Sequence, residues 1–196
     1  MVNRADENWL DRAGTHFEES TGTIPERLAA FPRYVDRSSL ARFVIRYELF
    51  KKMMHVQGSI VECGVYRGAG LFAFAQLCAL FEPLNHRRRV IGFDTFSGFP
   101  SVSDSDRGSA VSHTGGLAGA GLAEMQSAVN LYDTDRPFSQ APKVHLVSGD
   151  FMATGLSSWR AILISSFPCC TSTSIFANRR PKHSSFSCHG CRQGQS

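Results

Sequence analysis

One acidic residue and three glycines lie at the end of a short apolar stretch and just after it, in a pattern that suits a ligand site. Glu62, Gly64, Gly68 and Gly70 form this pattern, with the spacing Glu-x-Gly-x-x-x-Gly-x-Gly. Glycine allows the backbone to turn sharply and lets a ligand approach it closely. A helix that starts after such a turn presents free N–H groups and the positive end of its dipole. These residues are therefore candidates for binding a ligand.

Two further acids follow apolar stretches later in the chain. Asp94 ends the second stretch, and Asp150 with Phe151 follows the third. The two oxygens of a carboxylate at position 94 can accept hydrogen bonds from both hydroxyls of a ribose. Asp150 can accept from an adenine amino group while Phe151 stacks on the ring. Each of these residues alone is as readily a capping or turn residue, and only their combination favours a site.

The elements that must position these residues alternate between strands and helices. Strands are predicted at residues 59–64, 89–94 and 143–147, and helices at 36–58 (capped by Asp36 or Ser38), 71–81 and 122–131. This order predicts one half of a doubly wound α/β sheet, whose ligands bind at the carboxyl ends of the strands. All three groups of candidate residues would then meet at one edge. The predicted fold class is α/β, a Rossmann-like sheet that is incomplete, with about three native-like strands.

The remaining segments are predicted to be less regular. Residues 1–35 are expected to form an irregular or partly helical N-terminal arm, and residues 36–155 the N-terminal part of the ligand-binding domain. Residues 95–118 are rich in glycine and serine, which predicts a long mobile loop. Residues 156–196 are expected to be an aberrant, disordered tail, in which only residues 161–167 are apolar enough to pair as a makeshift strand beside the first strand.

The charge is distributed unevenly along the 196 residues. The whole chain carries a net charge of +4, but residues 1–150 hold 16 basic and all 17 acidic residues, a net of −1. Residues 151–196 hold five basic residues and no acidic one, a net of +5. The positive charge thus belongs to the tail, and it does not indicate a nucleic-acid or membrane partner for the domain. With no apolar leader visible, we expect a cytoplasmic protein.

The first acid also discriminates between two classes of ligand. A dinucleotide site would have Gly-x-Gly-x-x-Gly around a pyrophosphate, whereas here Glu62 stands in the first position. An acid disfavours a pyrophosphate and suits a ligand with an amino group, such as the methionine part of S-adenosylmethionine. An NAD(P)-dependent Rossmann enzyme remains the alternative.

Two long motifs stand out, residues 60–68, Ile-Val-Glu-Cys-Gly-Val-Tyr-Arg-Gly, and residues 90–100, Val-Ile-Gly-Phe-Asp-Thr-Phe-Ser-Gly-Phe-Pro. They resemble the macrocin O-methyltransferase (TylF-like) family of class I S-adenosylmethionine-dependent methyltransferases, and residues 147–151 are similar to the third strand end of that family. The resemblance covers about residues 36–155. It implies methylation of a hydroxyl on a sugar or small natural product, and a possible homo-oligomer in the intact family.

The resemblance also assigns roles to individual residues. It places Glu62, Gly64 and Gly68 around the methionine part, Asp94 at the ribose, and Asp150 with Phe151 at the adenine. Tyr66, Arg67 and Thr95 lie in the same motifs and are assigned to the cofactor site too. Arg67 can contact the cofactor carboxylate, or it can equally be a solvated turn residue.

The family pattern breaks off after Asp150. The resemblance implies a fourth strand of the type Leu-Leu-Tyr-Leu-Asp-x-Asp, whose acids hold Mg²⁺ and supply a general base, but no Asp or Glu follows Asp150. No catalytic or metal-binding residue can therefore be assigned. Read one nucleotide out of register, residues 169–175 admit this motif, so we predict a frameshift near residues 154–156. The chain as written is then expected to be inactive.

The tail permits a third class of function, a noncatalytic zinc- or nucleic-acid-binding protein. Residues 188–191, Cys-His-Gly-Cys, have metal-ligand spacing, and Cys169, Cys170 and His183 could complete a zinc site. Residues 179–182, Arg-Arg-Pro-Lys, could contact nucleic acid. An out-of-frame tail explains both features without a function, so the prediction remains a small-molecule hydroxyl acceptor with no nucleic-acid or membrane partner.

Overall fold

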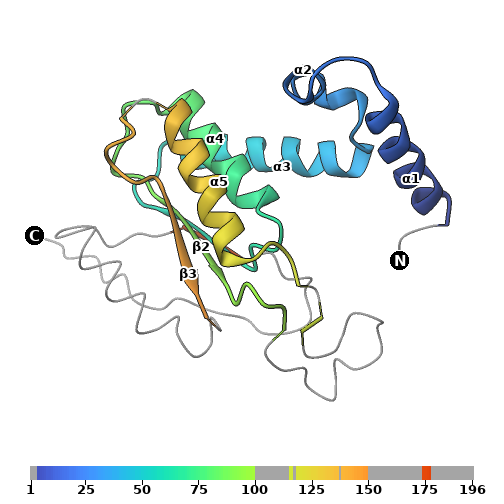
Figure 1. The fold of residues 1–196 in the computed structure, drawn as a ribbon. Coiled ribbons are helices and arrows are strands. Elements are labelled where there is room, and N and C mark those ends of the chain that lie inside the picture. The colour runs from blue at the N-terminus through green and yellow to red at the C-terminus, as the bar shows by residue number, and fades with distance from the viewer. Residues whose placement is uncertain (1–3, 100–114, 117, 137, 150–173, 178–196) are drawn as a thin grey trace, which may run out of the picture.

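A computed structural model describes residues 4–99, 115–116, 118–136, 138–149 and 174–177 (Figure 1). The predicted site residues Asp150 and Phe151, the candidate strand 161–167, the cysteine- and arginine-containing motifs of the tail and most of the loop 95–118 lie outside this part of the chain. The helices are α1 (Arg4–Glu19), α2 (Ile24–Ala29), α3 (Arg37–Met53), α4 (Ala69–Phe81) and α5 (Leu122–Asp135), with one 3-10 turn at Phe31–Arg33. The strands are β1 (Ile60–Cys63), β2 (Val90–Asp94), β3 (Val144–Ser148) and β4 (Ser174–Ala177).

The four strands form one parallel sheet in the order β3-β2-β1-β4. Ile60 of β1 pairs with Val90 of β2 on one side and with Ser174 of β4 on the other, so β1 has a neighbour on both sides. Helix α4 connects β1 to β2, and α5 lies between β2 and β3 in the chain. The three strands predicted from the sequence are confirmed, and so is the α/β class. Strand β4 was not predicted, and it lies within the segment that was expected to be an irregular tail.

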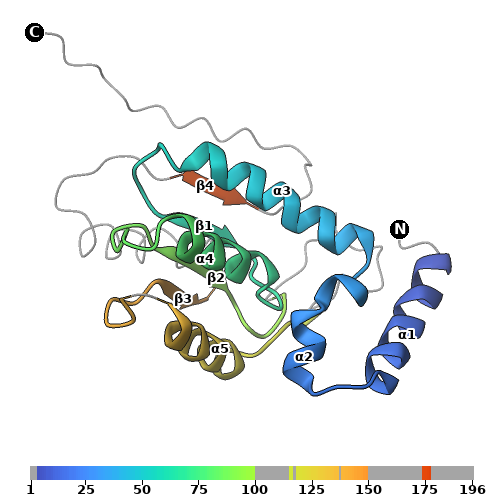
Figure 2. The same ribbon diagram turned by 90° about the horizontal axis from the view of Figure 1, so that it is seen from above.

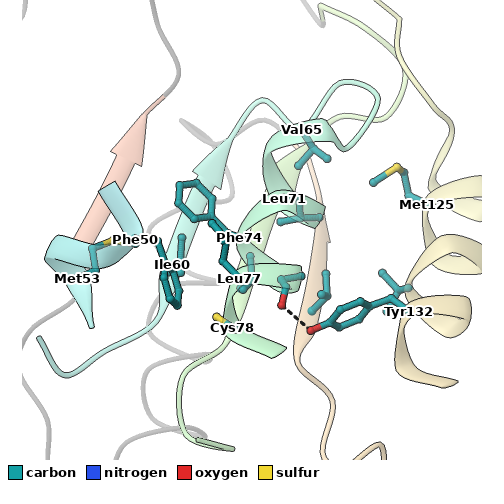
Figure 3. Packing of buried hydrophobic residues seen from close by; sticks show 14 of the residues in the cluster. Phe50, Met53, Ile60, Val65, Leu71, Phe74, Leu77, Cys78, Met125 and Tyr132 are labelled. Carbon is teal, nitrogen blue, oxygen red and sulfur yellow. Dashed lines mark hydrogen bonds between the residues drawn. The ribbon is translucent and has the colours of Figure 1, made fainter. Parts of the chain in front are cut away.

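One face of the sheet is covered by three helices that lie next to one another (Figures 1 and 2). Phe50 and Met53 of α3, Leu71 and Phe74 of α4, and Met125 of α5 pack with apolar residues of the strands in a single buried cluster (Figure 3). The Tyr132 hydroxyl of α5 donates a hydrogen bond of 2.7 Å to the Ala75 carbonyl of α4. Alternate strand residues Val61, Ile91 and Phe93 form a second buried cluster, as the period of a strand requires.

The N-terminal arm is more helical than expected. Helices α1 and α2 lie at the far end of α3, away from the sheet (Figure 2). A capping box between Thr23 and Glu26 begins α2, and the Arg27 guanidinium donates to the Phe17 carbonyl at 2.6 Å, which joins α2 to α1. Of the two predicted caps, Asp36 and Ser38, it is Asp36 that caps α3, since its Oδ1 accepts a 2.9 Å bond from the Ser39 N–H. None of the helices in the described ranges is long and apolar enough to cross a membrane.

A buried arginine secures the amino end of the sheet. Arg88, two residues before the start of β2, is 5% exposed, and its Nε lies 2.6 Å from Oε2 of Glu82. The same guanidinium donates to the carbonyls of Val56 at 2.8 Å and Gly58 at 3.0 Å. It thus joins the end of α4 to the turn between α3 and β1 through charge-assisted hydrogen bonds.

We predict that Arg88→Ala destabilises the fold strongly. The substitution takes the guanidinium away from the Glu82 carboxylate and from the turn carbonyls, so the free energy of unfolding should fall by about 3–5 kcal/mol. Urea denaturation measures this loss. The neighbouring Arg87, which is exposed, provides the control, because Arg87→Ala should change stability by no more than about 0.5 kcal/mol. Equal losses of stability in the two variants would contradict the stabilising role assigned to Arg88.

Candidate functional site

The turn between β1 and α4 has a backbone shape that depends on glycine. Gly64 and Gly68 have φ angles of +85° and +82°, which L-residues with a side chain rarely adopt. Gly68 is the N-cap of α4, and a Cβ there would lie 2.8 Å from the Met125 side chain. A Cβ at Gly64 would meet nothing within 4 Å, so the turn is open at this point. The glycines predicted from the sequence therefore shape a turn at the carboxyl edge of the sheet.

The Glu62 side chain lies beneath this turn, beside the first residues of α4. A Cβ on Gly70 would lie only 1.9 Å from Oε1 of Glu62, so the missing side chain at position 70 makes room for the carboxylate. Gly68 supplies no side-chain cap to α4, and the backbone N–H of Leu71 interacts with the Glu62 carboxylate instead. Glu62 is 5% exposed, and its Oε2 is buried without a hydrogen-bond partner in the described structure.

Burial changes the acidity of Glu62. Desolvation raises its pKa from 4.5 to about 7, against the opposing charge of Arg46 on α3, while the negative charge of Asp94 adds to the rise. The carboxyl group is thus poised to exchange a proton near neutral pH. A buried acid with an unpaired oxygen and a raised pKa is typical of a residue that binds a ligand.

Asp94 joins the two turns that leave β1 and β2. Its Oδ2 accepts a hydrogen bond of 2.8 Å from the Tyr66 N–H, and its Oδ1 accepts one of 2.9 Å from the Phe96 N–H. Backbone bonds extend the connection, since the Gly149 N–H at the end of β3 donates to the Asp94 carbonyl at 2.9 Å. The carboxyl ends of three neighbouring strands therefore meet around this residue, as the sequence predicted.

Other predicted site residues lie at the same edge with different surroundings. Tyr66 has a φ of +55°, and its half-exposed ring lies 5.8 Å from the guanidinium of the exposed Arg67. Thr95 uses its hydroxyl within its own turn, donating to the Gly98 carbonyl at 2.5 Å. The structure thus brings Glu62, Tyr66 and Asp94 together, whereas Arg67 is exposed beside the Tyr66 ring and Thr95 bonds within the loop after β2.

The sequence analysis missed a segment that contacts this site. Ala120, just before α5, donates its N–H to the Tyr66 carbonyl at 3.1 Å. A Cβ on Gly119 would lie 2.3 Å from the same oxygen, so only glycine fits there. The surrounding run of glycines and alanines carried no spacing that distinguishes these two residues from an ordinary loop. Within the described ranges, no group of three or more His, Cys, Asp or Glu residues could hold a metal ion.

The described architecture is that of a parallel α/β fold with its candidate site at the carboxyl ends of β1, β2 and β3, and solved structures narrow it to a methyltransferase-like fold. The chain resembles the crystal structure of CalS11, a calicheamicin methyltransferase, with a TM-score of 0.78 and 27% identity over 85% of this chain and 65% of that one. It also resembles an apo structure of CalS11, described as a TDP-rhamnose 3′-O-methyltransferase of calicheamicin biosynthesis, with a TM-score of 0.68 and 23% identity over 85% and 64% of the two chains.

These likenesses have a limited extent. The chain spans just under two thirds of the length of either CalS11 structure. No protein-family pattern matches the sequence, and no curated protein matches it. The methyltransferase-like fold is thereby shown, while membership of the macrocin O-methyltransferase family and the frameshift stay predictions.

The raised pKa of Glu62 predicts a loss of stability as the pH rises. The folded protein holds this proton up to about pH 7, whereas the unfolded chain releases it near 4.5, so the free energy of unfolding should fall between these values. The total fall is about 3 kcal/mol, at roughly 1.4 kcal/mol for each pH unit. His145 has a lowered pKa and acts in the opposite direction, so the difference between wild type and Glu62→Gln isolates the effect.

Urea denaturation from pH 4 to 8 measures this difference. Glu62→Gln should gain stability relative to wild type as the pH rises, while Glu124→Gln, which changes an exposed acid of α5, should follow the wild-type curve. Parallel curves for wild type and Glu62→Gln would show that Glu62 has an ordinary pKa.

Proposed function

We propose that this chain is the cofactor-binding part of an S-adenosylmethionine-dependent O-methyltransferase that acts on a hydroxyl of a sugar or small natural product. The observation that carries the proposal is the presence of two acids, Glu62 and Asp94, at the carboxyl ends of the adjacent parallel strands β1 and β2, within a fold like that of known methyltransferases. Ligands of open α/β sheets bind at this edge. The nature of the two acids supports a ligand that carries both an amine and a ribose.

Glu62 suits the amine of the methionine part. Its Oε2 is a buried acceptor that has no donor, and an ammonium group supplies both a donor and a compensating charge. The Gly64 turn above it leaves open space, which a ligand backbone can fill. A pyrophosphate at the same place would face the negative charge of Glu62.

Asp94 suits the ribose. Each of its oxygens already accepts one backbone N–H, and each has a second lone pair for a hydroxyl. The two backbone bonds fix the plane of the carboxylate, so the ribose would meet a group that is already oriented. Asp150 and Phe151 complete this proposal as the adenine contacts, on the strength of the sequence resemblance alone.

The chemistry of the proposed reaction is a direct displacement. When bound, S-adenosylmethionine would supply a methyl group on a positively charged sulfur: an acceptor oxygen would form the new O–C bond as the S–C bond breaks, S-adenosylhomocysteine would leave, and the hydroxyl proton would go to a base. The described residues bind and orient: Glu62 holds the amine, Asp94 holds the ribose, and the Gly64–Gly68 turn admits the ligand. A general base and a Mg²⁺ site are expected by resemblance, but the sequence has no acid after Asp150 to supply them. We therefore propose that the chain as written binds the cofactor without methylating an acceptor.

An NAD(P)-dependent enzyme is the second candidate, because an acid at the end of β2 also suits the ribose of a nicotinamide cofactor. Two features argue against this candidate. The buried Glu62 would face the pyrophosphate, and the sequence has no Gly-x-Gly-x-x-Gly turn to receive it. Cytoplasmic location, a homo-oligomer in the intact family and the absence of nucleic-acid and membrane partners remain predictions.

The binding proposal predicts a selective ligand. In isothermal titration calorimetry, S-adenosylhomocysteine should bind the wild-type chain, while NAD and zinc should not. Asp94→Asn keeps one acceptor oxygen but removes the charge and the second acceptor, so it should weaken binding by about 1.5–3 kcal/mol, or roughly ten- to hundredfold. Asp135→Asn, at the exposed end of α5, is the matched control and should bind as wild type. Binding of NAD in preference to S-adenosylhomocysteine would favour the second candidate.

Binding should also release protons near pH 7. The ammonium group of the ligand favours ionised Glu62, so its pKa falls on binding and the carboxyl loses the proton it holds near neutrality. The observed binding enthalpy at pH 7 should therefore depend on the ionisation enthalpy of the buffer. Glu62→Gln should abolish that dependence. A wild-type enthalpy that is the same in all buffers would argue against contact between the amine and Glu62.

We also propose that the tail results from a one-nucleotide frameshift. Two features support this: the out-of-register reading of residues 169–175 admits the missing acidic strand, and β4 at Ser174–Ala177 pairs with β1 where a fourth strand belongs. Resequencing the gene tests the proposal. A corrected frame should encode acids in this region and yield a chain that methylates a hydroxyl acceptor, whereas methyl transfer by the chain as written would contradict it.

A further inference from the structure

The backbone of Tyr66 is hydrogen-bonded on both sides of its Cα by groups far apart in the sequence. Its N–H donates to Oδ2 of Asp94 at 2.8 Å, and its carbonyl accepts the N–H of Ala120 at 3.1 Å. The φ angle of +55° is uncommon for a residue with a side chain. A backbone conformation of this kind persists where surrounding contacts over-determine it, and here those contacts come from β2 and from the segment before α5.

Gly119 forms the tightest part of this contact. A Cβ added to it would lie 2.3 Å from the Tyr66 carbonyl oxygen and 2.4 Å from the carbonyl carbon. Both neighbours are backbone atoms, so they cannot move aside as the end of a side chain could. By contrast, Gly121 is only two residues further along, has a φ of −68° as N-cap of α5, and would have no atom within 4 Å of an added Cβ.

The segment before α5 is in turn tied to the turn after β2. Phe99 donates its N–H to the Gly116 carbonyl at 3.0 Å and accepts the Gly115 N–H at 2.9 Å. Gly98 has a φ of +86°, and a Cβ there would lie 2.5 Å from the Gly115 carbonyl oxygen. These contacts form a closed ring. Asp94 bonds to Tyr66, and Tyr66 bonds to Ala120. Gly115 and Gly116, which precede Ala120 in the chain, bond to Phe99, which lies five residues after Asp94.

We infer that Gly119 and Ala120 are positioning residues for the candidate cofactor site, because they contact the carbonyl of Tyr66, the residue whose N–H orients the Asp94 carboxylate. The inference deepens the proposed function, and the part that concerns cofactor affinity rests on it. By this inference, the backbone pairing between Phe99 and Gly115–Gly116 also helps to fix the position of Asp94, the acid proposed to bind ribose. A disturbance on either side of the ring should therefore change ligand affinity without direct contact with the ligand.

Substitution of the two neighbouring glycines in the full chain tests the inference. In Gly119→Ala, amide hydrogen exchange at Tyr66 should become at least about tenfold faster, and the affinity for S-adenosylhomocysteine should fall at least about tenfold. The matched control Gly121→Ala should change neither value by more than about twofold. Exchange at Val61 and Ile91, in the sheet centre, should stay at wild-type rates in both variants if the effect is local.

A second variant acts on the other side of the ring. Gly98→Ala does not touch Tyr66, but it disrupts the pairing with Gly115, so it should also accelerate Tyr66 exchange and weaken binding. If Gly119→Ala fails to fold, Gly98→Ala tests the inference instead, by Tyr66 amide exchange and by affinity for S-adenosylhomocysteine. Wild-type exchange at Tyr66 in a folded Gly119→Ala variant, or wild-type affinity despite faster exchange, would overturn the inference. If the wild-type chain binds no S-adenosylhomocysteine, the proposed function fails, and the exchange measurement alone decides whether Gly119 holds Tyr66.

Discussion

The arrangement at the carboxyl edge depends on one carboxylate that receives two backbone N–H groups. Asp94 accepts from Tyr66 on the turn after β1 and from Phe96 on the turn after β2. Charge-assisted bonds of this kind are stronger than those between neutral groups, and two of them fix the orientation of a side chain. The turns that leave β1 and β2 are thus set relative to each other by the same group that is proposed to bind ribose.

The two ends of the sheet use charge in opposite ways. At the amino end, Arg88 is buried with all its contacts inside the protein, and its charge is balanced by Glu82. At the carboxyl end, Glu62 is equally buried, yet one of its oxygens has no donor and its pKa is raised to about 7. A satisfied buried charge supports a fold, whereas an unsatisfied one lowers its stability and marks a place where a partner can bind.

Short sequence patterns predicted the parts of the fold that depend mainly on neighbouring residues in the chain. The buried strands β1, β2 and β3, the Asp36 cap and the glycine turn at Gly64–Gly68 all follow from short runs of sequence. The contact of Gly119 with Tyr66 joins residues more than fifty positions apart and could not be read from spacing. Strand β4 was missed because Ser174–Ala177 lies in a serine- and cysteine-rich stretch with no apolar alternation, and its pairing with β1 depends on the sheet rather than on its own residues.

The central claim is that a ligand with an amine and a ribose binds across the carboxyl ends of β1 and β2. Titration of the ¹⁵N-labelled chain with S-adenosylhomocysteine, followed by amide chemical shifts, tests it most directly. The account predicts shifts at Gly64, Tyr66 and Phe96, together with constant shifts at the amino end near Gly58 and Arg88. Shifts confined to the amino end, or none at any ligand concentration, would contradict it.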